Sequence, residues 1–413
     1  MTAIDPAPPF EPSRRQAWAA VMAGSAAMIV TGLQPLLLSE MAYIGRLSPA
    51  LIHPAAVIDM LAMAGAIALF AFRVPPRDLP RIGLAAGAVA ALVCLAGLFA
   101  SGWLFLPLRA VGGFAGGVLV WITIGMIARR EHSEPWAAAF FMVQAVGQVL
   151  AAAFAAMVVM QAMGRPAGMT FAAVIAALGG LAALAAPTAY PDLAQEPTGR
   201  RPGPRGWMAL AALFFYFAGV ATAWFHMRPL AAAQGVPATE PVVLAVLVAQ
   251  MVGVMIALAL ARRVGPVALF IGVSAVTLAS YILLALSPGP MLFLAGFALA
   301  AAASLTLGAS LFTFLQSADP SRRSGGVSAL AQLTAASLGP MLGMLWAERM
   351  GPTGALMVAG ALIIAGLGCL ASLLARPVTP EALAQALRYL IDAEFVTGQM
   401  IAVDSGQHLS FGT

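Results

Sequence analysis

Lysine is absent from this 413-residue chain, and charged residues of any kind make up only 9% of it. A soluble domain carries about 25% charged residues. A chain that is 62% hydrophobic has too little polar surface to remain in water. The composition therefore excludes an ordinary soluble protein. Its apolar runs of about 20 residues can each cross a hydrocarbon core of roughly 30 Å, which indicates a polytopic helical membrane protein.

Other shortages exclude further classes of protein. The two cysteines, Cys94 and Cys369, both lie inside apolar runs, where they are expected to be small buried residues and not a disulfide. The chain has no metal-ligand spacing, no phosphate-binding loop and no ATP-binding domain. We expect no cofactor and no ATP-driven transport by the chain alone. The net charge of +5 sits at the ends of apolar runs, which favours lipid headgroups over nucleic acid.

The apolar runs predict twelve transmembrane helices. The break between the third and fourth is marked by Ala100-Ser101-Gly102-Trp103. The expected spans are 16–39, 52–72, 82–101, 104–128, 136–160, 167–187, 207–230, 238–260, 265–286, 290–316, 325–347 and 353–375.

The arginines fall mainly in every second gap between these spans. One side of the membrane receives 16 of the 21 and the other receives four, while Arg109 falls inside a span. Basic residues are retained on the cytoplasmic side. The split predicts cytoplasmic termini and an even number of spans, in a bacterial inner membrane. The four on the opposite side are Arg46, Arg165, Arg228 and Arg349.

The chain divides into two similar halves. A proline- and arginine-rich linker at 188–206 separates six spans at 16–187 from six at 207–376, between a cytoplasmic segment at 1–15 and a tail at 377–413. Gln144 and Gln332 are 188 residues apart, and Gly164 and Gly351 are 187 apart. Two repeated six-helix halves are a common transporter plan, with substrate held near the midplane.

Two stretches and the six-linker-six layout resemble the major facilitator superfamily. Span four contains Arg109 followed four residues later by Gly113 and further small residues, which is similar to the family's fourth-helix motif. Span eleven, with Ser324-Gly325-Gly326 before Gln332 and Gly339-Pro340, is similar to the eleventh-helix pattern of bacterial members. The resemblance implies the major facilitator fold and transport by alternating access.

The loop between spans two and three departs from that family's pattern. The family has Gly-x-x-x-Asp-Arg-x-Gly-Arg there, whereas this chain has Arg73-Val74-Pro75-Pro76-Arg77-Asp78-Leu79-Pro80-Arg81. The charges persist without the glycines. Arg77 and Asp78 are the expected gate-side charges.

Ionisable groups inside spans are costly, at roughly 2.5 kcal/mol or more each, so the few present are candidates for function. Asp59 lies 14 residues from Arg73, or about 21 Å from the inner boundary. It is either a protonatable carrier or a structural residue, which pairs with Arg109 or makes a polar contact with another helix. Arg109 itself either faces a cavity, where it binds an anionic group or assists coupling, or extends to the outer interface.

The remaining candidates are polar residues at or within spans. Glu40 follows Gln34-Pro35, where the proline can break the helix, although a plain span end is an alternative. His226 near the outer end of span seven can titrate near neutral pH or lie at the interface. Gln34, Gln144 and Gln332 can hydrogen-bond a substrate or a neighbouring helix.

The glycines of spans four and eleven are spaced for close helix packing. A glycine lets two helix backbones approach, so these positions are expected to support rocking motions without binding ligand. They are Gly112, Gly113, Gly116, Gly117, Gly339 and Gly343.

The tail differs from the spans in its sequence pattern. After a helix start at Thr379-Pro380-Glu381, the segment from Val396 to Gly406 resembles the C-terminus of short-chain dehydrogenases/reductases. That family's Tyr-x-x-x-Lys pair cannot exist without lysine, so a reductase activity is rejected. A remnant of a gene fusion or a frameshift is the preferred account.

These patterns together predict a secondary active transporter and not an enzyme. We expect a monomer in the bilayer that moves a small organic solute, coupled to protons, with export favoured over import. The alternative is a non-transporting sensor or scaffold that uses the same fold.

Overall fold

The computed structural model describes residues 10–191, 201–233, 235–236, 240–260, 263–286 and 289–374. Within these ranges the chain is almost entirely helical, and its only β-pairing is an isolated bridge between Arg77 and Ala189. The tail, Arg388 within it, and the middle of the predicted linker lie outside the described residues.

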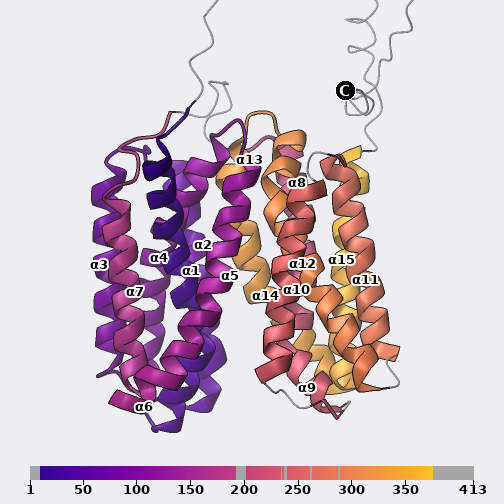
Figure 1. Ribbon diagram of the computed structural model, residues 1–413, viewed down its shortest axis with the longest axis horizontal. Helices are drawn as coiled ribbons and strands as arrows, with labels where there is room; N and C mark the ends of the chain where they lie inside the picture. The colour runs from indigo at the N-terminus through magenta and orange to yellow at the C-terminus, as the bar shows by residue number, and fades with distance from the viewer. Residues whose placement is uncertain are drawn as a thin grey trace, which may run out of the picture.

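Twelve helical passes form two bundles that stand side by side (Figure 1). The first bundle comprises α1 (Arg14–Tyr43), α2 (Pro49–Arg73), α3 (Leu79–Gly97), η1 (Gly102–Leu104), α4 (Phe105–Ala128), α5 (Glu134–Phe154), η2 (Ala155–Val159), α6 (Met160–Met163) and α7 (Ala167–Ala183). The second comprises α8 (Pro204–Phe225), α9 (Met227–Ala233), α10 (Glu240–Leu260), α11 (Pro266–Leu286), α12 (Pro290–Ala318), α13 (Arg323–Gly326), α14 (Ser328–Met350) and α15 (Pro352–Leu374).

Ten of the described helical segments are long and apolar enough to cross a membrane. The helix Ala167–Ala183 and the apolar stretch Val248–Ala257 are shorter. Every span predicted from the sequence coincides with a helix, so the predicted all-α membrane fold is confirmed.

The two ends of the bundles differ in charge. We call the end at which α1 begins the arginine-rich end, because the α2–α3, α4–α5 and α12–α13 loops there carry Arg77, Arg129, Arg130 and Arg322. It is the upper end in Figure 1, and α6 and α9 lie at the opposite, arginine-poor end.

Local sequence explains where the helices begin and end. Ser13 caps α1 in a capping box with Gln16, and proline occupies the first turn of several other helices, where its missing N–H costs nothing. The fifth span ends at Gly164 with φ +86°, and the eleventh ends at Gly351 with φ +71°. Glycine adopts positive φ without strain. The two halves therefore end corresponding spans with the same backbone device.

Some spans differ from the simple rods predicted. The seventh breaks at His226 into α8 and α9, because Pro229 has no N–H to donate to the carbonyl of residue 225. The fifth contains a π-helical segment, Ala155–Val159. The helix break that Pro35 can cause does not occur, because α1 continues through it. At the C-terminal end of the predicted linker, α8 starts at Pro204 with Gly203 as its cap.

Candidate functional site

Asp59 of α2 and Arg109 of α4 form an ion pair deep inside the N-terminal bundle. Arg109 Nη2 lies 2.6 Å from Asp59 Oδ1. Asp59 is 1% exposed and Arg109 is 4% exposed. Each charge is therefore shielded from solvent and lipid and is neutralised by the other. Arg109 does not extend to the interface, so that alternative is excluded.

Gln34 of α1 adds a third helix to this site. Its side-chain Nε2 donates a hydrogen bond to Asp59 Oδ2, so both carboxylate oxygens of Asp59 have a donor. Gln34 is as deeply buried as Asp59. Within the described residues, Gln34 Oε1 and Arg109 Nε are buried without a hydrogen-bond partner. In the group formed by Gln34, Asp59 and Arg109, both carboxylate oxygens thus have a hydrogen-bond donor, while one atom each of Gln34 and Arg109 has no partner.

A cavity of about 20 Å³ adjoins the ion pair. Asp59 and Arg109 line it together with Thr31, Cys94 and small residues of α3 and α7. A polar cavity needs about 10–15 Å³ to hold one water molecule. The site therefore has room for a single water beside the charges, and it lies within one bundle.

Glycines of α4 set the distance between α4 and α2. A Cβ added at Gly113 would clash with the carbonyl oxygen of Asp59, and one at Gly117 would clash with that of Met63. Gly116 faces the Met63 side chain, and Gly112 faces Val93 of α3. The backbone of α4 thus lies directly against α2 at the residue that carries the charge.

The glycines of α14 play the same geometric role in the other half. A Cβ at Gly339 would clash with the carbonyl oxygen of Ala218 in α8, and one at Gly343 would meet Thr222 and His226.

Glu40 lies in a separate cluster at the arginine-poor end. It forms an ion pair with Arg165, whose guanidinium lies 3.8 Å from the centre of the Tyr43 ring. Arg165 is exposed, so this pair ties the end of α1 to the loop before α7 at the surface.

The other candidates are dispersed. His226 caps α8, with Nδ1 2.8 Å from the carbonyl oxygen of Thr222. Gln144 is buried in α5 and Gln332 is half-buried in α14. In the described part of the chain, no hydrogen bond joins these three residues to the Asp59–Arg109 pair.

Arg77 and Asp78 lie in the loop between α2 and α3. Both side chains are exposed, and Asp78 adopts φ +54°. Backbone hydrogen bonds from Leu79 to Thr188 and from Tyr190 to Pro76 tie this loop to the chain that leaves α7. No ion pair between Arg77 and Asp78 is present among the described residues.

Tyr190 anchors this loop region to α4. Its hydroxyl donates to the carbonyl oxygen of Ile122 at 2.7 Å, and its ring lies under the Arg129 guanidinium. Burial raises the pKa of the Tyr190 phenol well above its usual value, while the Arg129 charge acts in the opposite direction.

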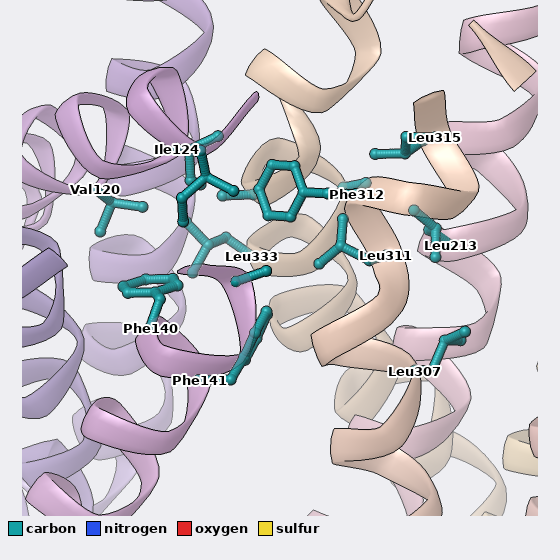
Figure 2. Packing of buried hydrophobic residues seen from close by; sticks show 14 of the residues in the cluster. Val120, Ile124, Phe140, Phe141, Leu213, Leu307, Leu311, Phe312, Leu315 and Leu333 are labelled. Atoms are coloured by element: carbon teal, nitrogen blue, oxygen red, sulfur yellow. The ribbon is translucent and has the colours of Figure 1, made fainter. Parts of the chain in front are cut away.

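The two halves meet through an apolar contact towards the arginine-rich end. Figure 2 shows Ile124 and Phe141 of the N-terminal half on the side of Phe312 and Leu311 of α12 and Leu333 of α14. Nearby, Ala138 of α5 packs with Val254, Ala257 and Ala309 of the other half. Ala138 lies in the second turn of α5, so this contact also belongs to the arginine-rich end.

Polar bonds across the seam reinforce this apolar contact. Arg322 Nη1 donates to the main-chain oxygens of Arg130 at 3.1 Å and Arg129 at 3.5 Å, at the end of α4. Gln316 donates to the Ser133 hydroxyl at 3.3 Å, and the Thr313 hydroxyl donates to Glu134 at 3.1 Å. We call this set of three contacts the seam latch.

Sequence reasoning missed the latch and one histidine. Arg322 was used only to predict the orientation of the chain in the membrane, although its position after Asp319-Pro320-Ser321 marks a tight turn. His53 of α2 packs edge-on against Phe225 of α8, with ring centres 6.4 Å apart, and so joins the halves at the arginine-poor end. A histidine at the start of an apolar span was the available signal.

No protein-family model and no curated protein matches this sequence. Solved structures do match. The human organic anion transporter MFSD10 superposes with a TM-score of 0.67 at 15% identity, covering 87% of this chain and 100% of that one. A bacterial homologue of the iron transporter ferroportin, in an outward-facing state with soaked iron, gives 0.67 at 14%, covering 89% and 100%. The E. coli fucose:proton symporter gives 0.61 at 12%, covering 86% and 97%. The chain shares the fold of these transporters.

Proposed function

We propose that this protein is a secondary active transporter that moves a small organic solute by alternating access. The observation that carries the proposal is the pair of six-helix bundles joined across a narrow seam by the seam latch and its apolar neighbours. Contacts between two rigid bundles can be exchanged from one end to the other, which is the motion that alternating access requires. The shared fold with three transporters supports the same conclusion.

The arginine distribution supports an orientation. Arginine is retained on the cytoplasmic side, so the arginine-rich end and both termini face the cytoplasm, in a bacterial inner membrane. With that orientation the seam latch closes the cytoplasmic side. The halves also touch at the opposite end, where His53 packs against Phe225, so the conformation described here joins them on both sides of the membrane.

The Asp59–Arg109 pair is the proposed coupling element. With Asp59 ionised, its carboxylate holds Arg109 and Gln34, and α2, α4 and α1 are tied together. A proton on Asp59 removes one charge and leaves the Arg109 guanidinium without its counter-ion. Arg109 then favours an anionic partner or a different arrangement of α4. Proton uptake thereby changes the packing between helices of one half, which is the step that coupling requires.

The three transporters of the same fold have different substrates. They are an organic anion transporter, a bacterial homologue of an iron transporter, and a symporter of fucose and protons. The fold therefore selects no substrate. We propose a small organic solute, exported in exchange for protons.

Reconstitution tests the proposal. The purified full-length protein is first screened for solutes that raise its unfolding temperature at two pH values, and hits are then assayed in liposomes with a pH gradient of either sign. A pH-sensitive dye inside the liposomes reports proton movement. We expect solute flux that drives proton flux, and the productive sign of the gradient gives the direction.

Two variants separate coupling from folding. Asp59→Asn should abolish solute-driven proton movement, whereas Glu131→Gln makes the same chemical change on an exposed loop and should leave it intact. Flux with unchanged pH dependence in Asp59→Asn would overturn the coupling role. The absence of flux for every solute and either gradient would overturn transport itself and favour the sensor or scaffold.

A further inference from the structure

An apolar groove runs along the outside of the N-terminal bundle between α2, α3 and α4. Its volume is about 600 Å³, and all of its lining residues are apolar. Pockets that hold small ligands span about 300–1,000 Å³. Its walls include Phe70 of α2, Val89 of α3, and Val111 and Phe114 of α4. Val89, Val111 and Phe114 are exposed, so the groove opens on the surface that faces the bilayer.

Arginines stand at one mouth of this groove. Arg73 lies one helical turn beyond Phe70 on α2, and Arg81 lies one turn before Ala85 on α3, so each shares a helix face with a lining residue. Arg77 lies in the loop between them. All three are exposed, and none forms an ion pair within the described residues. Asp78, which is exposed, is the one acidic residue in the sequence from Arg73 to Arg81, so this segment keeps a net positive charge.

The length of the groove suits one leaflet. From Arg81 to Val89 is eight residues, or about 12 Å of helix. Half of a hydrocarbon core is about 15 Å thick. A molecule with its head at the arginines would therefore extend its tail to about the depth of the bilayer midplane.

We propose that this groove binds one anionic phospholipid from the leaflet at the arginine-rich end. Arg73, Arg77 and Arg81 hold the phosphate-containing headgroup, and an acyl chain lies between α2, α3 and α4. The charges at the mouth distinguish this occupant from a neutral lipid or an apolar solute, which would gain nothing from three cations. The site borders α2 and α4, the helices that carry Asp59 and Arg109, but its occupancy does not depend on transport.

Native mass spectrometry of the full-length protein tests the assignment. The detergent-solubilised protein is titrated with phosphatidylglycerol, phosphatidylethanolamine and phosphatidylcholine that carry identical tails. We expect phosphatidylglycerol to be retained most tightly. Arg73→Gln/Arg81→Gln should weaken its binding about twenty-fivefold, from about fivefold per arginine at a membrane surface. Arg14→Gln/Arg15→Gln, which removes the same charge from exposed positions at the start of α1, should not.

Two further variants test whether a loss of lipid binding comes from loss of folding and whether the groove itself holds the acyl chain. Arg73→Lys/Arg81→Lys keeps the charge and should retain most of the binding, while Val89→Phe fills the groove and should reduce retention of all three lipids. Equal retention of phosphatidylglycerol and phosphatidylcholine would overturn the proposal. So would equal effects of the two double glutamine variants, or full displacement of the lipid by glycerol phosphate, which has a headgroup without a tail.

Discussion

The two halves share a backbone plan but differ in what they bury. The N-terminal half encloses the Asp59–Arg109 ion pair. An offset of 188 residues from these positions leads to Leu247 and Phe297, which carry no charge. In the described part of the C-terminal half, the buried charged residues Asp319 and Arg323 lie after the end of α12 and at the start of α13. The buried polar groups of its long helices are hydroxyls: Tyr216 lies 3.2 Å from Thr277 and 3.3 Å from the Ala303 carbonyl oxygen.

This difference in buried polar groups assigns helix packing and proton coupling to different halves. A hydroxyl network bonded to helix carbonyls holds helices together and stays neutral at physiological pH. A buried ion pair holds them together only while both partners are charged, because a lone buried charge is strongly destabilising. We therefore expect proton sensitivity in the first half and a proton-insensitive scaffold in the long helices of the second.

The largest effect is expected from breaking the ion pair. Arg109→Met leaves Asp59 charged without a counter-ion and should cost about 3–5 kcal/mol. Asp59→Leu/Arg109→Met removes both charges and should recover most of that loss. Chemical denaturation of the detergent-solubilised protein measures both. If Arg109→Met is as stable as the parent protein, the pair does not contribute as proposed.

A matched pair of glycine substitutions compares the halves directly. Gly113→Ala drives a Cβ into the Asp59 carbonyl oxygen, and Gly253→Ala drives one into the Ala302 carbonyl oxygen. Each should cost up to about 3 kcal/mol of stability, the range for overpacking. Only the first should also change the pH dependence of transport, since only the first displaces the helix that carries Asp59.

Gly112→Ala is the control for this comparison. Its Cβ would approach only the Val93 side chain, at 3.2 Å, and a side chain can shift where a backbone cannot. An equal loss in Gly112→Ala and Gly113→Ala would contradict the close packing of α4 on α2.

A smaller effect is expected at the seam, where the halves meet. Arg322→Ala removes the donor to the end of α4 and should weaken the closed arrangement by about 1.5 kcal/mol, the low end for bonds to a charged group, because Arg322 is half-buried. That corresponds to about a tenfold shift in population. Distances between spin labels on α5 and α10, in a cysteine-free background, report the shift. An unchanged distance distribution would show that Arg322 does not help to hold the two halves together.

The smallest effect is expected in the hydroxyl network. Tyr216→Phe should cost only about 1 kcal/mol, because Thr277 keeps its bond to the Val273 carbonyl oxygen at 2.8 Å. Transport should keep its pH dependence. A changed pH profile in Tyr216→Phe would contradict the division of roles between the halves.

Hydropathy alone predicted the twelve spans, because each must satisfy its own backbone in lipid. The pairing of Asp59 with Arg109 was foreseen as one of two alternatives, since a buried acid needs a nearby base. Gln34 could not be assigned to it, because the contact depends on how α1 is rotated against α2. The seam latch was also beyond prediction, since it depends on how α12 packs against the start of α5 and on the positive φ of Arg322. The break before α9 was predictable from Pro229.

The acceptors of Arg322 are main-chain oxygens, which every amino acid carries. Substitutions at positions 129 and 130 can therefore change the side chains without losing the acceptors, whereas the donor is lost whenever the Arg322 side chain is replaced. The other two contacts of the latch lack this tolerance, because their acceptors are the side chains of Ser133 and Glu134.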